Sequence, residues 1–298
     1  MKKLAMSLLL ALAAAPFAGA QSSGTQSSGA PGSDALVSSS PLIVAATYNI
    51  RMNTPRDGVN AWPNRAAWVR ELVRFHEWDI FGTQEGFREQ LDDLLQMEEY
   101  AQIGVGRDDG ADKGEHSAIF YRRDRFELLD KGDFWLSETP DRPGAGWDAQ
   151  IFRICSWGKF RDKFGGREFF FFSAHFDHIG VQARVESSKL IVKKIAEITG
   201  GAPTILVGDM NSTPDSDAYA VLAASLRDSY KVTENPPYGP EATFNSFDWD
   251  RDPAGDGRID YLFSTEGVRV LRYGVLTDSK DKRYPSDHFP VEIKLTLR

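Results

Sequence analysis

Short apolar runs alternate with longer stretches of helical periodicity from residue 41 to the end of the sequence. Glu168–Ala174 contains four consecutive phenylalanines, which predicts a buried strand near the middle of a sheet. Gln182–Thr199 is the clearest predicted helix, because Val185, Ile191 (or Val192), Ile195 and Ile198 recur at helical spacing. Further predicted strands are Leu42–Tyr48, Asp79–Gln84, Ser117–Tyr121, Ile151–Trp157, Thr204–Val207, Ile259–Phe263, Val268–Leu276 and Val291–Leu297, and further predicted helices are Asn64–Trp78 and Phe87–Leu95.

The order of these elements favours an α/β fold. Strands occur in both halves of the sequence with helices between them, which is typical of two β-sheets packed face to face with helices outside. No internal repeat of solenoid or propeller length is present in the sequence. We therefore expect one α/β domain over residues 42–298.

The N-terminal segment predicts export. Lys2 and Lys3 precede the apolar run Leu4–Ala15, and Ala18-Gly19-Ala20 has the small residues of a cleavage site. We expect residues 1–20 to be a signal peptide and residues 21–41, rich in Ser and Gly, to be a flexible linker. The alternative is an uncleaved anchor. The expected location is secreted or periplasmic.

Composition narrows the class of protein. Hydrophobic residues make up 41% and charged residues 26% of 298 residues, which excludes a disordered, collagen-like or polytopic membrane protein. The single cysteine, Cys155, excludes an intramolecular disulfide framework and a multi-cysteine zinc site. The net charge of −8 provides no basic field for nucleic acid, although a bound divalent metal can still recruit phosphate locally.

Polar side chains with metal-ligating or acid–base chemistry follow or precede six of the predicted strands. Any single case is explained by a chain returning to solvent, but the set combines hard oxygen ligands with imidazoles, which favours a functional site. The residues are Asn49, Glu85, His175, Asp177, Asp209, Asn211, Asp260, Asp287 and His288.

The motifs around these residues resemble, in order, those of the endonuclease/exonuclease/phosphatase superfamily, which has the DNase I-like fold. They are Tyr48-Asn49, Gln84-Glu85, Ala174-His175-Phe176-Asp177, Gly208-Asp209-Met210-Asn211 and Ser286-Asp287-His288. The resemblance extends from Leu42 to Leu297, and Gly114–Tyr121 with Arg125–Leu128 is most similar to the deadenylase branch and its bacterial relatives. It implies a four-layer α/β sandwich of two packed mixed β-sheets flanked by helices.

The resemblance implies a divalent cation and an activated water. Glu85 matches the family's metal carboxylate, and Asp287 is expected to join the metal shell. Asn49 is expected to share that shell or orient the phosphate, with a strand-end turn as the alternative. Asp209 is expected to deprotonate the attacking water and Asn211 to donate to a phosphoryl oxygen, with a simple turn as the alternative. The expected ion is Mg²⁺ or Mn²⁺.

Two histidines are expected to be catalytic. His288 with Asp260 resembles the family's imidazole–carboxylate pair, in which His288 is either a base or a phosphate stabiliser. His175 is expected to contact the phosphoryl group or assist the leaving oxygen. His76 and His178 are interpreted as structural or surface residues, and His116 receives no role.

Weaker candidates remain outside these motifs. Arg107 and Lys280–Arg283 are interpreted either as phosphate contacts or as solvated loop residues. Arg184 resembles an arginine common in the deadenylase branch, with an ordinary surface ion pair as the alternative. Trp147 and Trp249 lie in Gly-, Asp- and Pro-rich loops, where an exposed tryptophan can stack on a base or a sugar ring, although core packing is the simpler alternative.

The combined prediction is a secreted, divalent-metal-dependent phosphoester hydrolase, either a phosphodiesterase or a phosphatase. One alternative is an extracellular nuclease, of exonuclease or endonuclease type, acting on RNA or DNA. Another is a noncatalytic binding protein on the same fold. The expected partner is a substrate only: a phosphorylated small molecule such as an inositol phosphate, a nucleic acid, or a phospholipid such as sphingomyelin. We expect a monomer without a stable protein partner.

Overall fold

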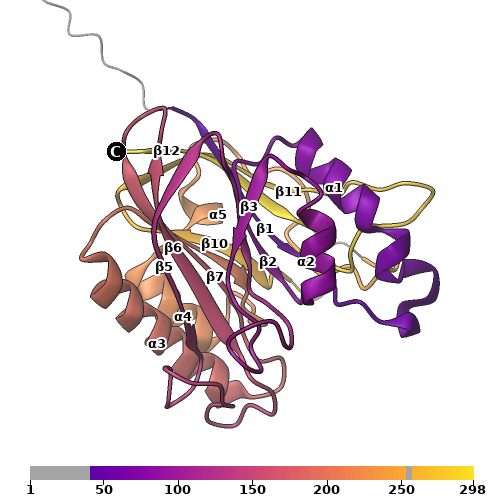
Figure 1. Cartoon of the computed structure of the whole chain (residues 1–298), viewed down its shortest axis with the longest axis horizontal. Helices are drawn as coiled ribbons and strands as arrows, with labels where there is room; N and C mark the ends of the chain where they lie inside the picture. The colour runs from indigo at the N-terminus through magenta and orange to yellow at the C-terminus, as the bar shows by residue number, and fades with distance from the viewer. Residues whose placement is uncertain (1–40, 253–256) are drawn as a thin grey trace, which may run out of the picture. The chain divides into compact units, whose positions relative to one another are not determined.

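The computed structural model describes residues 41–252 and 257–298, so the predicted signal peptide and nearly all of the predicted linker lie outside the described residues. The described residues all belong to one compact unit. In its described part, two mixed β-sheets of six strands each pack against one another (Figure 1). The predicted α/β sandwich is therefore confirmed.

The first sheet has the strand order β11-β12-β1-β2-β4-β3, and the second has the order β5-β6-β7-β8-β10-β9. The strands of the first sheet are β1 (Ile43–Asn49), β2 (Ile80–Gln84), β3 (Tyr100–Ile103), β4 (Ile119–Arg122), β11 (Val268–Val275) and β12 (Val291–Leu297). Those of the second are β5 (Phe126–Trp135), β6 (Ile154–Asp162), β7 (Glu168–His175), β8 (Thr204–Asp209), β9 (Arg227–Asp228) and β10 (Asp260–Ser264).

Helices cover the outer face of each sheet (Figure 1). The first sheet packs against α1 (Ala66–Phe75) and α2 (Arg88–Leu94), and two 3-10 turns, Pro55–Asn60 and Trp62–Asn64, precede α1. The second sheet packs against α3 (Val181–Thr199) and α4 (Asp217–Ser225), while the short α5 (Ser229–Val232) adjoins β9, β10 and β11. No helix in the described ranges combines the length and the apolar character needed to cross a membrane.

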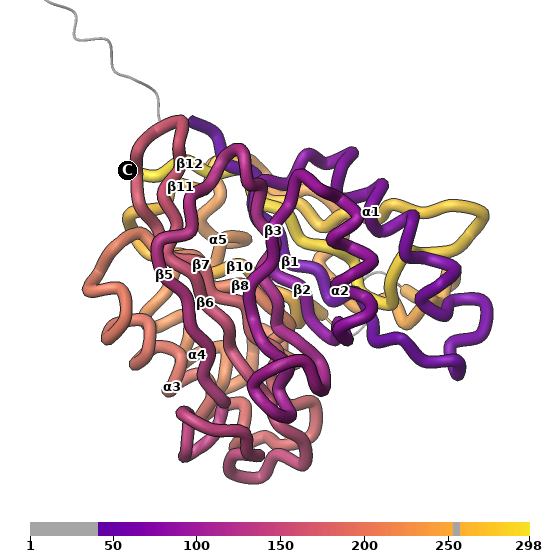
Figure 2. Tube along the Cα trace, viewed as in Figure 1, coloured from indigo at the N-terminus to yellow at the C-terminus, as the bar shows by residue number. Residues whose placement is uncertain are grey.

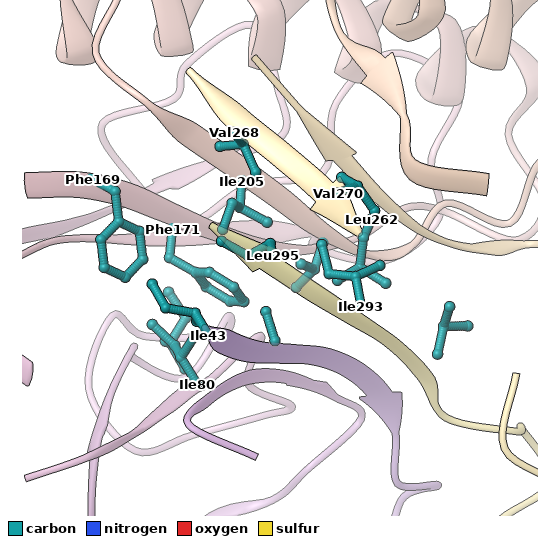
Figure 3. Close-up of a cluster of buried hydrophobic side chains, with 14 of the residues drawn as sticks. Ile43, Ile80, Phe169, Phe171, Ile205, Leu262, Val268, Val270, Ile293 and Leu295 are labelled. Carbon is teal, nitrogen blue, oxygen red and sulfur yellow. The ribbon is translucent and has the colours of Figure 1, made fainter. Parts of the chain in front are cut away.

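The four phenylalanines of β7 explain how the layers hold together. Phe169 and Phe171 face the core between the sheets, where they pack near Ile43 and Ile80 (Figure 3). Phe170 and Phe172 belong to the core beneath α3 and α4. Because successive strand residues point to opposite faces, a continuous apolar run is what a strand buried on both sides requires.

Two predicted helix faces were only partly correct. Ser187 and Ser188 are buried on α3, whereas Val185 is half-buried, because α4 packs closely there and Ser188 Oγ donates to the Ala218 carbonyl over 2.9 Å. On α1 the helical spacing of Ala67, Leu72 (or Val73) and Phe75 predicts the buried face, but Phe75 is 79% exposed and Ala67 is exposed as well. The buried α1 residues are Ala66, Val69, Leu72 and Val73.

The sheets approach one another closely at Gly82 in β2. A Cβ atom on Gly82 would lie 2.5 Å from Val207 Cγ2 and 2.7 Å from Ser173 Oγ, both in the opposite sheet. Beside this point, Gln84 Nε2 donates to Ser173 Oγ over 3.3 Å. A residue without a side chain at position 82 thus allows the C-terminal ends of β1, β2, β7 and β8 to meet.

We expect Gly82→Ala to lower the free energy of unfolding by about 1–3 kcal/mol, because the added methyl group overpacks the core. Denaturant unfolding measures this change. Adding Val207→Ala should cost less than the sum of the two single changes, since it removes the clashing methyl group. Gly144→Ala is the control, because its Cβ would approach nothing closer than Thr139 Oγ1 at 3.8 Å. Simple additivity of Gly82→Ala and Val207→Ala would contradict the close approach.

Candidate active site

Strand register brings the predicted site residues to one edge of the sandwich. β1 and β2 are parallel, with Asn49 opposite Gln84, so Glu85 follows directly beside Asn49. In the second sheet β7 and β8 are parallel, with His175 opposite Asp209, and β10 is antiparallel to β8, with Asp260 opposite Asp209. These three strands lie side by side in the chain trace (Figure 2). Sheet pairing alone therefore groups side chains that are far apart in the sequence.

Three non-glycine residues of this edge have a left-handed backbone. Arg51, Glu85 and Asn211 have φ values of 57°, 66° and 43°, and each lies one or two residues beyond the end of β1, β2 or β8. Such conformations are disfavoured for residues with a Cβ and are concentrated at functional sites. The turns after the strands are thus strained in the segments that carry the predicted chemistry.

Asn49 lies at the centre of the group and joins the two sheets. Its Nδ2 donates to Glu85 Oε1 over 3.0 Å and to Asp209 Oδ2 over 3.1 Å, and lies 3.4 Å from His288 Nε2. The backbone carbonyl of Asn49 accepts a hydrogen bond of 2.7 Å from Ser286 Oγ. Because the Asn49 side chain is fully buried, it orients the two carboxylates from behind rather than facing solvent.

The surroundings of His288 favour its charged form. Its Nδ1 donates to Asp260 Oδ2 over 2.9 Å, as the predicted pair requires. Burial disfavours the imidazolium, but Asp260, Asp209 and Asp287 outweigh it and raise the pKa of His288 to about 10. The ring thus places a fixed positive charge at the site.

The pKa of Asp209 is also raised, which for a carboxyl group favours the neutral form. Burial and the neighbouring Asp260 carboxylate raise the pKa of Asp209 to about 7, although His288, the Asn211 amide and Asn49 oppose the shift. A carboxylate that titrates near neutral pH is suited to accept a proton from water.

His175 and Asn211 flank Asp209. His175 Nε2 lies 3.5 Å from Asp209 Oδ2, and burial together with Arg153 and Arg107 holds the pKa of His175 well below its usual range. Asn211 Nδ2 donates to the Phe176 carbonyl over 3.0 Å and lies 3.1 Å from His175 Nε2. Both amide hydrogens of Asn211 thus have partners, so donation to a phosphoryl oxygen requires an exchange with one of them.

Glu85 and Asp287 share one cation, Arg51. Its guanidinium lies 3.8 Å from Glu85 Oε2 and 3.7 Å from Asp287 Oδ2, and makes a closer ion pair of 3.0 Å with Asp57. The pKa of Glu85 lies below its usual value although burial opposes this shift. The shift comes from the His288 charge, from the hydrogen bonds that Asn49 and Met52 donate, and from Arg51. Burial raises the pKa of Asp287.

These groups surround a cavity of about 410 Å³. Its wall contains four carboxylates against two guanidinium groups and the His288 imidazolium, so acidic groups still outnumber the cations. Asn49 and Asp260 lie behind the wall. The lining residues are Arg51, Met52, Glu85, Glu115, Ile151, Arg153, His175, His178, Asp209, Asn211, Phe244, Ile259, Asp287 and His288.

Sequence reasoning missed four charged or titratable residues of this wall. Arg51 and Arg153 belong to no recognisable sequence motif. Glu115 was noted only as part of Gly114–Tyr121, the segment that resembles the deadenylase branch. His178 was interpreted as structural or surface, but it lines the cavity and its Nδ1 lies 3.1 Å from Arg153 Nη2. Only its place three residues after His175 could have suggested this position.

Other candidates lie outside the cavity wall. Arg107 pairs with Glu115 over 2.7 Å, and Arg184 Nη1 donates to the Asp177 carbonyl over 3.1 Å. Asp177 itself accepts from the Ile179 and Gly180 amides before α3. In the Lys280–Arg283 segment, Arg283 donates to the Val59 carbonyl and to Asn60, and none of these described residues lines the cavity.

Two donor sets in the site have the chemistry of a metal centre. Asp209, Asp260 and His288 offer ligand atoms that lie within 4.8 Å of one another, but His288 Nδ1 is already bonded to Asp260. Glu85 and Asp287 instead present oxygen donors to the cavity, where Arg51 is their shared partner. Hard oxygen donors in excess of cations fit Mg²⁺ or Mn²⁺.

The chain is similar to proteins of known structure over most of its length. A mannosyl-6-phosphatase from Bacteroides thetaiotaomicron is 46% identical, with a TM-score of 0.82 over 86% of this chain and 100% of that chain. The human Nocturnin catalytic domain, which carries a bound sulfate, shares the fold at 20% identity and a TM-score of 0.68, covering 87% of this chain and 94% of that chain.

A curated relative from Acanthamoeba polyphaga mimivirus, an uncharacterized protein, is 24% identical over 221 residues and covers 62% of this chain. This chain spans only 32% of that viral protein.

The Endonuclease/Exonuclease/phosphatase family model matches residues 46–288, the segment that holds every strand-end residue described above. This match confirms the resemblance seen in the sequence motifs, and the chain belongs to the endonuclease/exonuclease/phosphatase family.

Proposed function

We propose that this chain is a divalent-metal-dependent phosphatase that hydrolyses the phosphate monoester of a phosphorylated sugar. The observation that carries the proposal is the buried group of Asn49, Asp209 and His288, in which a near-neutral carboxylate lies beside an imidazolium. The sugar is suggested by the full-length similarity to a mannosyl-6-phosphatase.

Each side chain has a distinct task in this proposal. Asp209 accepts a proton from water as the water oxygen attacks phosphorus and the bond to the sugar oxygen breaks. The sugar oxygen takes up a proton and leaves as a hydroxyl group, phosphate is released, and Asp209 returns its proton to solvent. His288 supplies positive charge beside the phosphoryl oxygens, and Asp260 holds its ring and its proton in place. Asn211 positions His175, whose neutral ring lies 3.5 Å from the Asp209 carboxylate.

Glu85 and Asp287 are the residues that would hold the metal. A divalent cation there would offset the excess acidic charge of the wall, and Asn49 keeps the Glu85 carboxylate oriented. When bound, such an ion neutralises charge on the phosphoryl group.

The proposal includes export. Residues 1–20 have the sequence of a signal peptide, as set out above. Cell fractionation with N-terminal sequencing of the full chain should find Gln21 as the first residue outside the cytoplasm. Retention of Met1 in the cytoplasmic fraction would contradict this part of the proposal.

A substrate panel tests the activity. We expect hexose 6-phosphates to be hydrolysed faster than bis(p-nitrophenyl) phosphate, inositol phosphates, sphingomyelin, RNA or DNA, because the chain is similar to a mannosyl-6-phosphatase. Activity should require Mg²⁺ or Mn²⁺ and be lost in chelator. Faster cleavage of RNA or DNA would favour the nuclease alternative, and no turnover of any substrate would favour a binding protein.

The metal-free protein should show the energetic cost of the buried Asp209. The pKa of Asp209 is raised from its ordinary value of 3.8 to about 7 in the folded protein, so folding favours the protonated carboxyl group. The stability that this preference contributes is fully present below pH 3.8 and is lost as pH rises through 7. Asp209→Asn should therefore raise the melting temperature at pH 8 by on the order of 5 °C, with the gap closing toward pH 5.

Thermal unfolding in chelator measures this difference. Asp141→Asn is the control, since Asp141 is exposed and should leave the melting temperature unchanged at either pH. A destabilised Asp209→Asn protein at pH 8 would contradict the assigned environment of Asp209.

A further inference from the structure

A second cavity, of about 310 Å³, adjoins the catalytic cavity, and the Phe244 side chain lines both. The ring of Phe244 lies 5.0 Å from the ring of His288, centroid to centroid. A substrate whose phosphate lies at His288 therefore has room beyond Phe244 for a further chemical group.

The floor of the second cavity is aromatic. Trp249 stacks on Tyr284 with centroids 5.3 Å apart and planes 24° apart, and Tyr284 in turn meets Phe289 edge-on at 5.0 Å. Phe289 directly follows His288, so this stack is anchored to the catalytic segment. Trp249 nevertheless remains 40% exposed. A supported, open aromatic face suits the C–H face of a sugar ring.

The polar residues of this cavity distinguish a sugar from a nucleic acid. Its wall contains Asp248 and Asp252 with one guanidinium, Arg251, which lies over the Phe244 ring at 5.0 Å. The described residues of this wall have no excess of cations to hold the repeated phosphates of a polynucleotide. Carboxylate oxygens instead accept hydrogen bonds from hydroxyl groups, which a saccharide offers in number.

We infer that this cavity is a subsite for the sugar ring adjoining the phosphorylated ring, so the preferred substrate is a phosphorylated oligosaccharide rather than a free hexose phosphate. The inference rests on the proposed function and extends it. The Trp249–Tyr284 pair supplies the stacking surface, and Phe244 separates the adjoining ring from the phosphate site.

Steady-state kinetics with two probes test the subsite: methyl α-mannoside 6-phosphate, and an α-linked mannobiose that carries one 6-phosphate. The disaccharide should have about a tenfold higher kcat/KM, mostly through KM, because one stacked ring adds a modest binding energy. Trp249→Ala should abolish that preference. Phe75→Ala, which removes an exposed aromatic ring on α1, should retain it.

Inhibition of the unaltered protein gives a second readout that does not depend on how the variants fold. Unphosphorylated mannobiose should inhibit turnover of the monosaccharide probe at about tenfold lower concentration than mannose does.

The outcomes separate the subsite from the catalytic proposal. Equal kcat/KM for the two probes, with no effect of Trp249→Ala, would overturn the subsite while the phosphatase proposal stands. Failure to hydrolyse either probe would overturn the proposed function itself. If a 5′-phosphorylated dinucleotide instead shows a higher kcat/KM than a mononucleotide, and Trp249→Ala removes the difference, the Trp249–Tyr284 pair binds bases. That result would overturn the saccharide subsite.

Discussion

The hydrogen bond between Asn49 on β1 and Asp209 on β8 is the contact on which the site depends, because it crosses from one sheet to the other. Asp209 is fully buried beside Asp260, and a buried carboxylate without partners is strongly unfavourable. Asn49, His288 and the Asn211 amide supply those partners. The site therefore exists only when the two sheets are packed, and the bare backbone of Gly82 permits that packing.

Neighbouring groups in the site set one another's protonation. The Asp260 carboxylate helps to raise the pKa of both Asp209 and His288. It therefore favours a base with a pKa near neutral pH, Asp209, beside a positively charged ring, His288. Arg153 contributes to keeping His175 neutral, and His288 helps to keep Glu85 ionised. Environments that separate the pKa values of adjacent groups are a general basis for assigning acid–base roles.

The sequence predicted the strand-end residues because apolar strands ending in chemically distinctive side chains are visible as local patterns. It did not predict β5, Phe126–Trp135, since an edge strand with mostly half-buried or exposed residues has too few apolar positions to be noticed. Ser187 and Ser188 on α3 are buried by contact with α4, which local periodicity cannot reveal. Arg153 reaches the cavity through the packing of its sheet, and no spacing in the sequence marks that position.

The most direct test of the catalytic role of Asp209 is the turnover of a hexose 6-phosphate by Asp209→Asn with Mg²⁺ present, measured on folded protein. If Asp209 accepts the proton from the attacking water, kcat should fall by on the order of 10²–10⁴-fold, as for loss of a general base. Turnover at the wild-type rate would contradict the account, because the buried carboxylate would then be structural and the water would be activated elsewhere.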